Sequence, residues 1–223
     1  MSTAQTKNSG IAGAIAAERR DLAAILAGLP PAAWDAPTLC QGWRVREVVA
    51  HITMPFRYRP PRFVFEMVRS RGNFNRMADR CARRDGTAPP EELAADLRDN
   101  EQNPWKPPGG GFEGALTHDV IHGLDITVAL GLDRRVPEDR LRMVLAAVTG
   151  PKSEKFFGTD LAGIALHAED LDWSLGSGVP MSGQAQDLAL VLCGRTLPPG
   201  HLRGEPSARF TGAGAGRDHL HDQ

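Results

Sequence analysis

Apolar residues recur every three or four positions along the first two thirds of the chain, which is the spacing of one face of an α-helix. From Ile11 to Leu29 this period predicts one long helix, and the first nine residues of the chain, a largely polar stretch, are expected to be mobile. Pro55 should bend or interrupt the next helix. The further helices that the pattern predicts cover residues 44–56, 63–69, 74–84, 90–101, 112–130 and 137–150.

The pattern changes after about residue 152. Apolar and polar residues alternate over 161–173, which predicts one or two β-strands, and the glycines that follow predict a turn over 176–178. A short amphipathic helix is predicted over 184–194. The chain is therefore expected to be mainly α, with a helical bundle over residues 10–150, a small α/β domain over 155–210 and a flexible tail over 211–223.

Three histidines carry the candidate chemistry. His118 and His122 stand four residues apart on the helix predicted over 112–130, so their imidazoles share one face, one turn apart. His51 lies beside the apolar stripe of the helix predicted over 44–56. If His51 meets the other two, three nitrogen ligands with an open position would hold a catalytic divalent metal. Such a metal could itself activate a bound group, and the sequence does not identify a catalytic side chain.

Several neighbouring residues admit more than one interpretation. Asp125, three residues after His122, could orient an imidazole, act as a fourth ligand or be an ordinary helix-surface carboxylate. Trp43 is expected to be a core anchor or to line a pocket. Cys40 has no activating base near it in the sequence, so a small turn residue is expected there rather than a nucleophile.

Composition removes several classes of function. The chain has 223 residues, of which 41% are hydrophobic and 24% charged, and its formal net charge of −1 provides no general attraction to nucleic acid or anionic lipid. The arginines between Arg57 and Arg76 alternate with Phe and Met, which favours a solvated helical face over a nucleic-acid surface. No apolar run has the length of a membrane span, and the start of the chain does not have the pattern of a signal peptide. The 3 widely spaced cysteines indicate a reducing cytoplasm.

Three segments together resemble one known family. The stretch from Trp34 to His51, WDAPTLCQGWRVREVVAH, closely resembles the N-terminal region of the mycothiol-dependent maleylpyruvate isomerase family, which belongs to the wider DinB-like metal-binding four-helix bundles. The stretch from His118 to Asp125 is similar to the second metal motif of that family. Residues 168–176 continuing to 194–195 resemble its small C-terminal α/β part, and the whole resemblance covers roughly residues 15–205.

The resemblance implies a DinB-like four-helix bundle with a small C-terminal α/β unit and a metal held by His51, His118 and His122. Zinc is expected first, with nickel or iron as alternatives, because all three accept imidazole ligands. Mycothiol is the implied thiol cosubstrate, and the implied activity is a thiol S-transferase or an isomerase. One departure matters, because the isomerase itself has a glutamate at the position of His118. Three histidines are instead typical of the broader superfamily, so the exact reaction stays open.

Arg195 is the remaining candidate. The resemblance makes it a possible anion anchor for the substrate or the thiol, whereas its place at the end of a predicted helix also suits simple capping by a cation. The expected partners are a small-molecule electrophile and a low-molecular-weight thiol, without nucleic acid or membrane, in a monomer or homodimer. The alternative function is a metal-binding scaffold or small-molecule binding protein of the DinB-like superfamily with no chemistry of its own.

Overall fold

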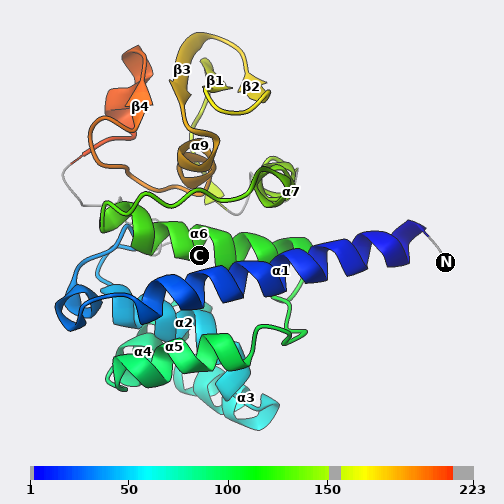
Figure 1. The fold of residues 1–223 in the computed structure, drawn as a ribbon, viewed down its shortest axis with the longest axis vertical. Helices are drawn as coiled ribbons and strands as arrows, with labels where there is room; N and C mark the ends of the chain where they lie inside the picture. The colour runs from blue at the N-terminus through cyan, green and yellow to red at the C-terminus, as the bar shows by residue number, and fades with distance from the viewer. Residues whose placement is uncertain (1–2, 151–156, 213–223) are drawn as a thin grey trace. The chain divides into compact units, whose positions relative to one another are not determined.

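The computed structural model describes residues 3–150 and 157–212. The chain forms two compact units (Figure 1): Met1–Pro37 with Gly42–His122, and Thr38–Gln41 with Gly123–Gln223. The division falls inside a single helix, α6 (Gly111–Ala129). The domain limits predicted near residues 150–155 stay a prediction. Most of the predicted flexible tail lies outside the described residues.

Helices build the first unit. Helix α1 packs against α5, and α2 packs against both α4 and α5. Two side-chain contacts, Arg19–Asp119 and His51–His118, tie the first part of α6 to α1 and α2. The helices are α1 (Thr3–Ala27), α2 (Val45–Arg57), α3 (Pro60–Arg69), α4 (Phe74–Asp85) and α5 (Pro90–Asp99), with a short 3₁₀ helix, η1 (Pro31–Asp35), between α1 and α2.

The apolar stripe predicted for α2 forms part of the core. Val45, Val48 and Val49 are fully buried and Ile52 is 1% exposed. Burying such a side chain contributes about 1.5–3 kcal/mol relative to leaving it in water. The stripe therefore holds α2 in one rotational setting, and this setting also turns His51 inward, where it is buried.

Two of these helices continue where an interruption or a mobile stretch was among the expectations. The polar residues expected to be mobile before Ile11 are helical from Thr3 onward. A helix can continue through polar residues that contain no proline, although such residues present no apolar stripe by which to recognise it. Helix α2 also passes through Pro55 and ends at Arg57. A proline in the last turn removes few backbone hydrogen bonds, and the Tyr58 amide still donates to the Met54 carbonyl at 3.0 Å.

The second unit combines helices with a small sheet, so the prediction of a mainly α fold with a small α/β part is confirmed. The strand order is β2-β1-β3-β4, with β1 parallel to β3 and the other pairs antiparallel. Helix α9 packs on β1, β3 and α7. The elements are α7 (Glu138–Val148), β1 (Ile164–Ala168), β2 (Ser174–Gly176), β3 (Val179–Gly183), α9 (Ala185–Leu192), β4 (Leu202–Arg203) and the 3₁₀ helix η2 (Glu205–Arg209).

The predicted strand region is only partly a strand. Residues 161–173 contain one strand, β1, and the residues after Ala168 turn toward β2. The predicted turn at Gly176 and Gly178 is present, and both glycines have positive φ. A Cβ atom at Gly178 would lie 2.1 Å from the Gly163 carbonyl oxygen, so no other residue fits there.

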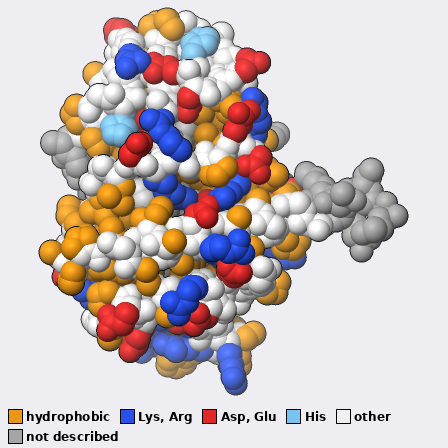
Figure 2. Space-filling view, viewed as in Figure 1, with side chains coloured by type: hydrophobic (Ala, Val, Ile, Leu, Met, Phe, Trp, Pro, Cys, Tyr) orange, Lys and Arg blue, Asp and Glu red, His pale blue; other side chains and the backbone are white. Residues whose placement is uncertain are grey.

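The surface of the first unit carries an arginine-rich face on and after α3. Four of the six exposed large hydrophobic side chains of the described residues, Val64, Phe65, Val68 and Phe74, lie in this segment. Figure 2 shows hydrophobic and basic side chains together at the end where Figure 1 places α3. Within the described ranges, no helix has both the length and the apolar character needed to cross a membrane.

Candidate metal centre

Three imidazoles from two helices meet inside the first unit. His51 comes from α2, and His118 and His122 come from α6. The ring centroids are 5.1 Å apart for His51 and His118, 5.0 Å for His51 and His122, and 4.8 Å for His118 and His122. The Nε2 atoms of His51 and His118 are 3.2 Å apart. We call these three residues the histidine triad.

The spacing of the triad suits one divalent ion. Zinc bound by imidazole nitrogens at about 2.0–2.1 Å in tetrahedral geometry needs nitrogen atoms about 3.3 Å apart. The His51–His118 distance of 3.2 Å is close to this value, and one ligand atom from each histidine lies within 4.8 Å of the others. The residues present therefore fit a metal.

Local structure explains why the triad forms. The i,i+4 spacing of His118 and His122 puts both on one side of α6, while fully buried Ala115 and Leu124 anchor the helix in the core. His51 is 8% exposed, whereas the other two histidines are half-buried. His51 on α2 is thus shielded from solvent, whereas His118 and His122 on α6 are partly exposed.

Two tryptophans lie against the triad. The Trp43 ring is 5.0 Å from the His51 ring, and its indole Nε1 donates to Asp79 at 2.8 Å. The Trp105 ring is 5.3 Å from that of His118. Trp43 was expected to be a core anchor or to line a pocket. It is half-buried and in contact with the triad. Trp105 was not predicted, because it stands in a Pro- and Gly-rich loop with no periodic pattern.

A buried ion pair also touches the triad and was not predicted. Asp119 accepts from Arg19 Nε at 2.7 Å, and its other oxygen is 2.9 Å from His118 Nδ1. Sequence spacing favoured Asp125 instead, since adjacent residues on a helix do not ordinarily face each other. The available signal was Arg19 itself, a charged residue on the apolar stripe of α1 between Ile15 and Leu22.

Asp125 lies in the second unit, in a buried cluster with Arg195 and Cys40. Its carboxylate is fully buried and accepts from Arg195 Nε at 2.8 Å and Nη2 at 2.9 Å. The Cys40 thiol donates to the same carboxylate at 3.0 Å. Arg195 Nη1 also donates to the Cys193 carbonyl at 2.9 Å, so it caps the end of α9. The metal-site role of Asp125 and the anchoring role of Arg195 stay predictions.

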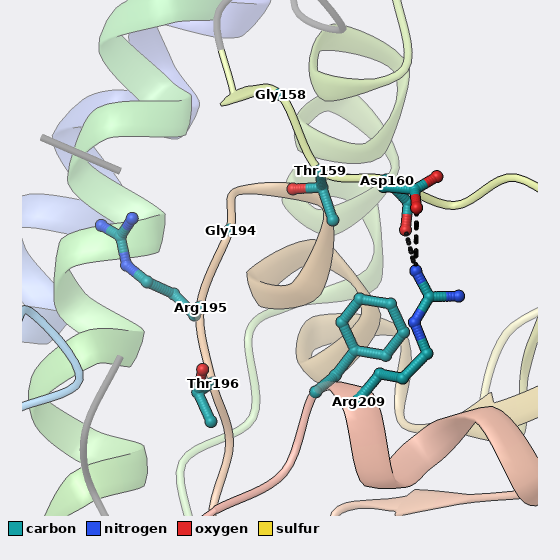
Figure 3. A pocket seen from close by; sticks show the side chains of 8 residues that line it. Gly158, Thr159, Asp160, Gly194, Arg195, Thr196 and Arg209 are labelled. Carbon is teal, nitrogen blue, oxygen red and sulfur yellow. Dashed lines mark hydrogen bonds and ion pairs between the residues drawn. The ribbon is translucent and has the colours of Figure 1, made fainter. Parts of the chain in front are cut away.

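A surface pocket of the second unit adjoins this cluster (Figure 3). The Arg195 side chain points away from Thr159 and toward α6, in agreement with its bonds to Asp125. On the other side of the pocket Arg209 pairs with Asp160. The lining residues are Gly158, Thr159, Asp160, Gly194, Arg195, Thr196, Arg209 and Phe210.

The surroundings of Cys40 disfavour the thiolate form of its side chain. Burial raises its pKa well above the usual value, and the negative charge of Asp125 raises it further, although Arg195 opposes both effects. We therefore expect iodoacetamide to modify Cys40 only slowly at pH 7, because the thiolate is the nucleophile. Mass spectrometry of the alkylated protein would measure this. The same protein unfolded in urea, where every cysteine should react, is the control, and rapid labelling of folded Cys40 would contradict the expectation.

The fold and the triad together define the class of the protein: a helical bundle with a three-histidine centre built from two of its helices. Residues 15–103 match the family model described as the mycothiol maleylpyruvate isomerase N-terminal domain. This part of the chain is therefore similar to that domain, in agreement with the resemblance. The match contains His51 and ends before His118. The assignment of His118 and His122 to the site therefore depends on the geometry alone.

Solved structures show the same fold. A crystal structure of the mycothiol-dependent maleylpyruvate isomerase aligns with a TM-score of 0.54 and 14% identity, covering 91% of this chain and 93% of that one. A histidine-to-alanine mutant of the mycothiol-dependent maleylpyruvate isomerase aligns with a TM-score of 0.51 and 14% identity, covering 86% and 91%. No curated protein matches the chain. The matched domain is named for an isomerase, in agreement with the expectation of an enzyme.

Proposed function

We propose that this protein is a divalent-metal-dependent enzyme that uses mycothiol as a cosubstrate and acts on a small electrophile. The observation that carries the proposal is the meeting of His51, His118 and His122, with two Nε2 atoms 3.2 Å apart. The match of residues 15–103 to the family model and the names of the two similar structures support mycothiol as the thiol. We propose zinc as the ion, with nickel or iron as alternatives.

The three imidazoles would bind the ion as neutral nitrogen ligands and leave a position open for the thiol. When bound, the ion supplies Lewis-acid chemistry, lowering the pKa of a coordinated thiol so that a thiolate is available at neutral pH. Trp43 and Trp105 would cover the sides of the triad and keep bulk water from two of its imidazoles. Arg195 is kept as a proposed anion anchor.

Two reactions suit this arrangement. S-transfer joins the thiol to an electrophile, so the free thiol is consumed. Cis–trans isomerisation by addition, rotation and elimination returns the thiol unchanged. Because His118 stands where the isomerase has a glutamate, both reactions are kept, and measuring whether mycothiol is consumed or returned during turnover separates them.

We place the reaction in the reducing cytoplasm, where low-molecular-weight thiols are kept reduced. The three cysteines lie in the described part of the chain, and none of them forms a disulfide.

The decisive experiment uses the purified full chain. Its metal content is measured by elemental analysis, and turnover is then followed with mycothiol and either maleylpyruvate or a generic alkylating electrophile. We expect about one divalent ion per chain, as a single triad implies, and turnover that requires both the metal and mycothiol. Bound metal without thiol-dependent turnover would support the non-catalytic binding protein instead. Absence of metal would overturn the proposal.

A further inference from the structure

A buried chain of polar contacts runs from α1 to the histidine triad. The Asp119 side chain is 1% exposed, and each of its oxygens has a separate partner. Oδ2 accepts from Arg19 Nε at 2.7 Å, and Oδ1 lies 2.9 Å from His118 Nδ1. Asp119 therefore connects the buried guanidinium of Arg19 to Nδ1 of His118.

The contact with Asp119 selects one tautomer of His118. A carboxylate oxygen can only accept a hydrogen bond, so the proton of the neutral ring must be on Nδ1. The lone pair is then on Nε2, the atom that faces His51 Nε2 at 3.2 Å. The nitrogen available to a metal is thus determined by the partner of the opposite nitrogen.

Arg19 in turn holds Asp119 in place. Its side chain is fully buried, Nη1 donates to the Asn103 carbonyl at 2.8 Å, and the guanidinium lies 4.7 Å from the centre of the Phe56 ring. A planar guanidinium bound to both a loop and a carboxylate leaves little freedom for either. The same loop continues to Trp105, which packs on His118.

We propose that Asp119, held by Arg19, is a positioning residue of the metal centre that keeps His118 in the tautomer presenting Nε2 to a divalent cation. This inference rests on the proposed function, since it assumes that the triad binds metal. It does not assume any particular substrate, and it assigns to Asp119 the orienting role that sequence spacing suggested for Asp125.

The test is a Co²⁺ titration of the metal-free full chain and of Asp119→Asn. Visible absorption reports the coordination of the ion, and competition with a chelator reports its affinity. Loss of a partner of this kind costs about 10–100-fold in metal affinity, so we expect that loss together with an altered Co²⁺ spectrum. Glu66→Gln is the matched control, because it also removes a buried carboxylate, one held by Arg80 at 2.5 Å and Arg84 at 2.6 Å. The control should bind Co²⁺ with unchanged affinity and spectrum.

A second measurement keeps the proposal testable if Asp119→Asn does not fold. Long-range ¹H–¹⁵N NMR of the metal-free wild-type protein reports the tautomer of each histidine, and His118 should carry its proton on Nδ1. A proton on Nε2, or an Asp119→Asn protein with wild-type affinity and spectrum, would overturn the inference while leaving the proposed function intact. A wild-type chain that binds no Co²⁺ would instead overturn the proposed function.

Discussion

Replacing His51 with alanine is expected to abolish both metal retention and mycothiol-dependent turnover. His51 is the only member of the triad that comes from α2, so without it the site keeps two ligands on one helix. Losing a direct ligand should weaken metal binding by more than about 100-fold, the upper end of the range for losing an outer partner. Elemental analysis of the purified variant and a titration of its metal-free form would measure the loss.

The control for this variant is His167→Ala. His167 is an exposed histidine on β1 of the second unit, so its removal tests the general effect of deleting an imidazole. We expect His167→Ala to keep its metal and its turnover. Normal metal content and activity in His51→Ala would show that the triad is not the metal centre.

Replacing Arg195 with methionine is expected to cause a large loss of stability. Asp125 is fully buried, and Arg195 donates to both of its oxygens. Removing one partner of a buried ion pair leaves an uncompensated charge, which costs about 3–5 kcal/mol. We expect the lower end of this range, because the Arg195 side chain is 21% exposed. Urea unfolding of the full chain at neutral pH, followed by circular dichroism, would measure the change.

An exposed ion pair of the same unit provides the comparison. Arg203 pairs with Glu169 at 2.7 Å, and its side chain is 72% exposed. Arg203→Met should cost less than about 1 kcal/mol, as is usual for surface pairs. Adding Asp125→Asn to Arg195→Met should recover part of the lost stability, since it removes the uncompensated charge. Equal losses of unfolding free energy in Arg195→Met and Arg203→Met would contradict the expectation that the buried ion pair stabilises the protein more than the exposed one.

Periodicity predicted those parts of the fold that have a continuous apolar face. The stripe on α2 and the helical pattern around His118 and His122 are properties of neighbouring residues, so they can be read along the chain. The start of α1 was missed because its first residues carry no apolar stripe. Strand β3 was missed because it contains Pro, Ser and Gly, and β4 because it has only 2 residues. Only the pairing of β3 with β1 and of β4 with β3 makes them strands.

The candidate site likewise combines features that local sequence predicts with contacts that it does not. Local geometry places His118 and His122 on one helical face and His51 beside a core stripe, so both features can be predicted from the amino-acid sequence. The packing of the helices is what brings these rings together, places Trp105 on His118 and lets Arg19 reach Asp119 across 100 residues of sequence. Such contacts depend on how helices pack, and the buried charges have partners that no local spacing can identify.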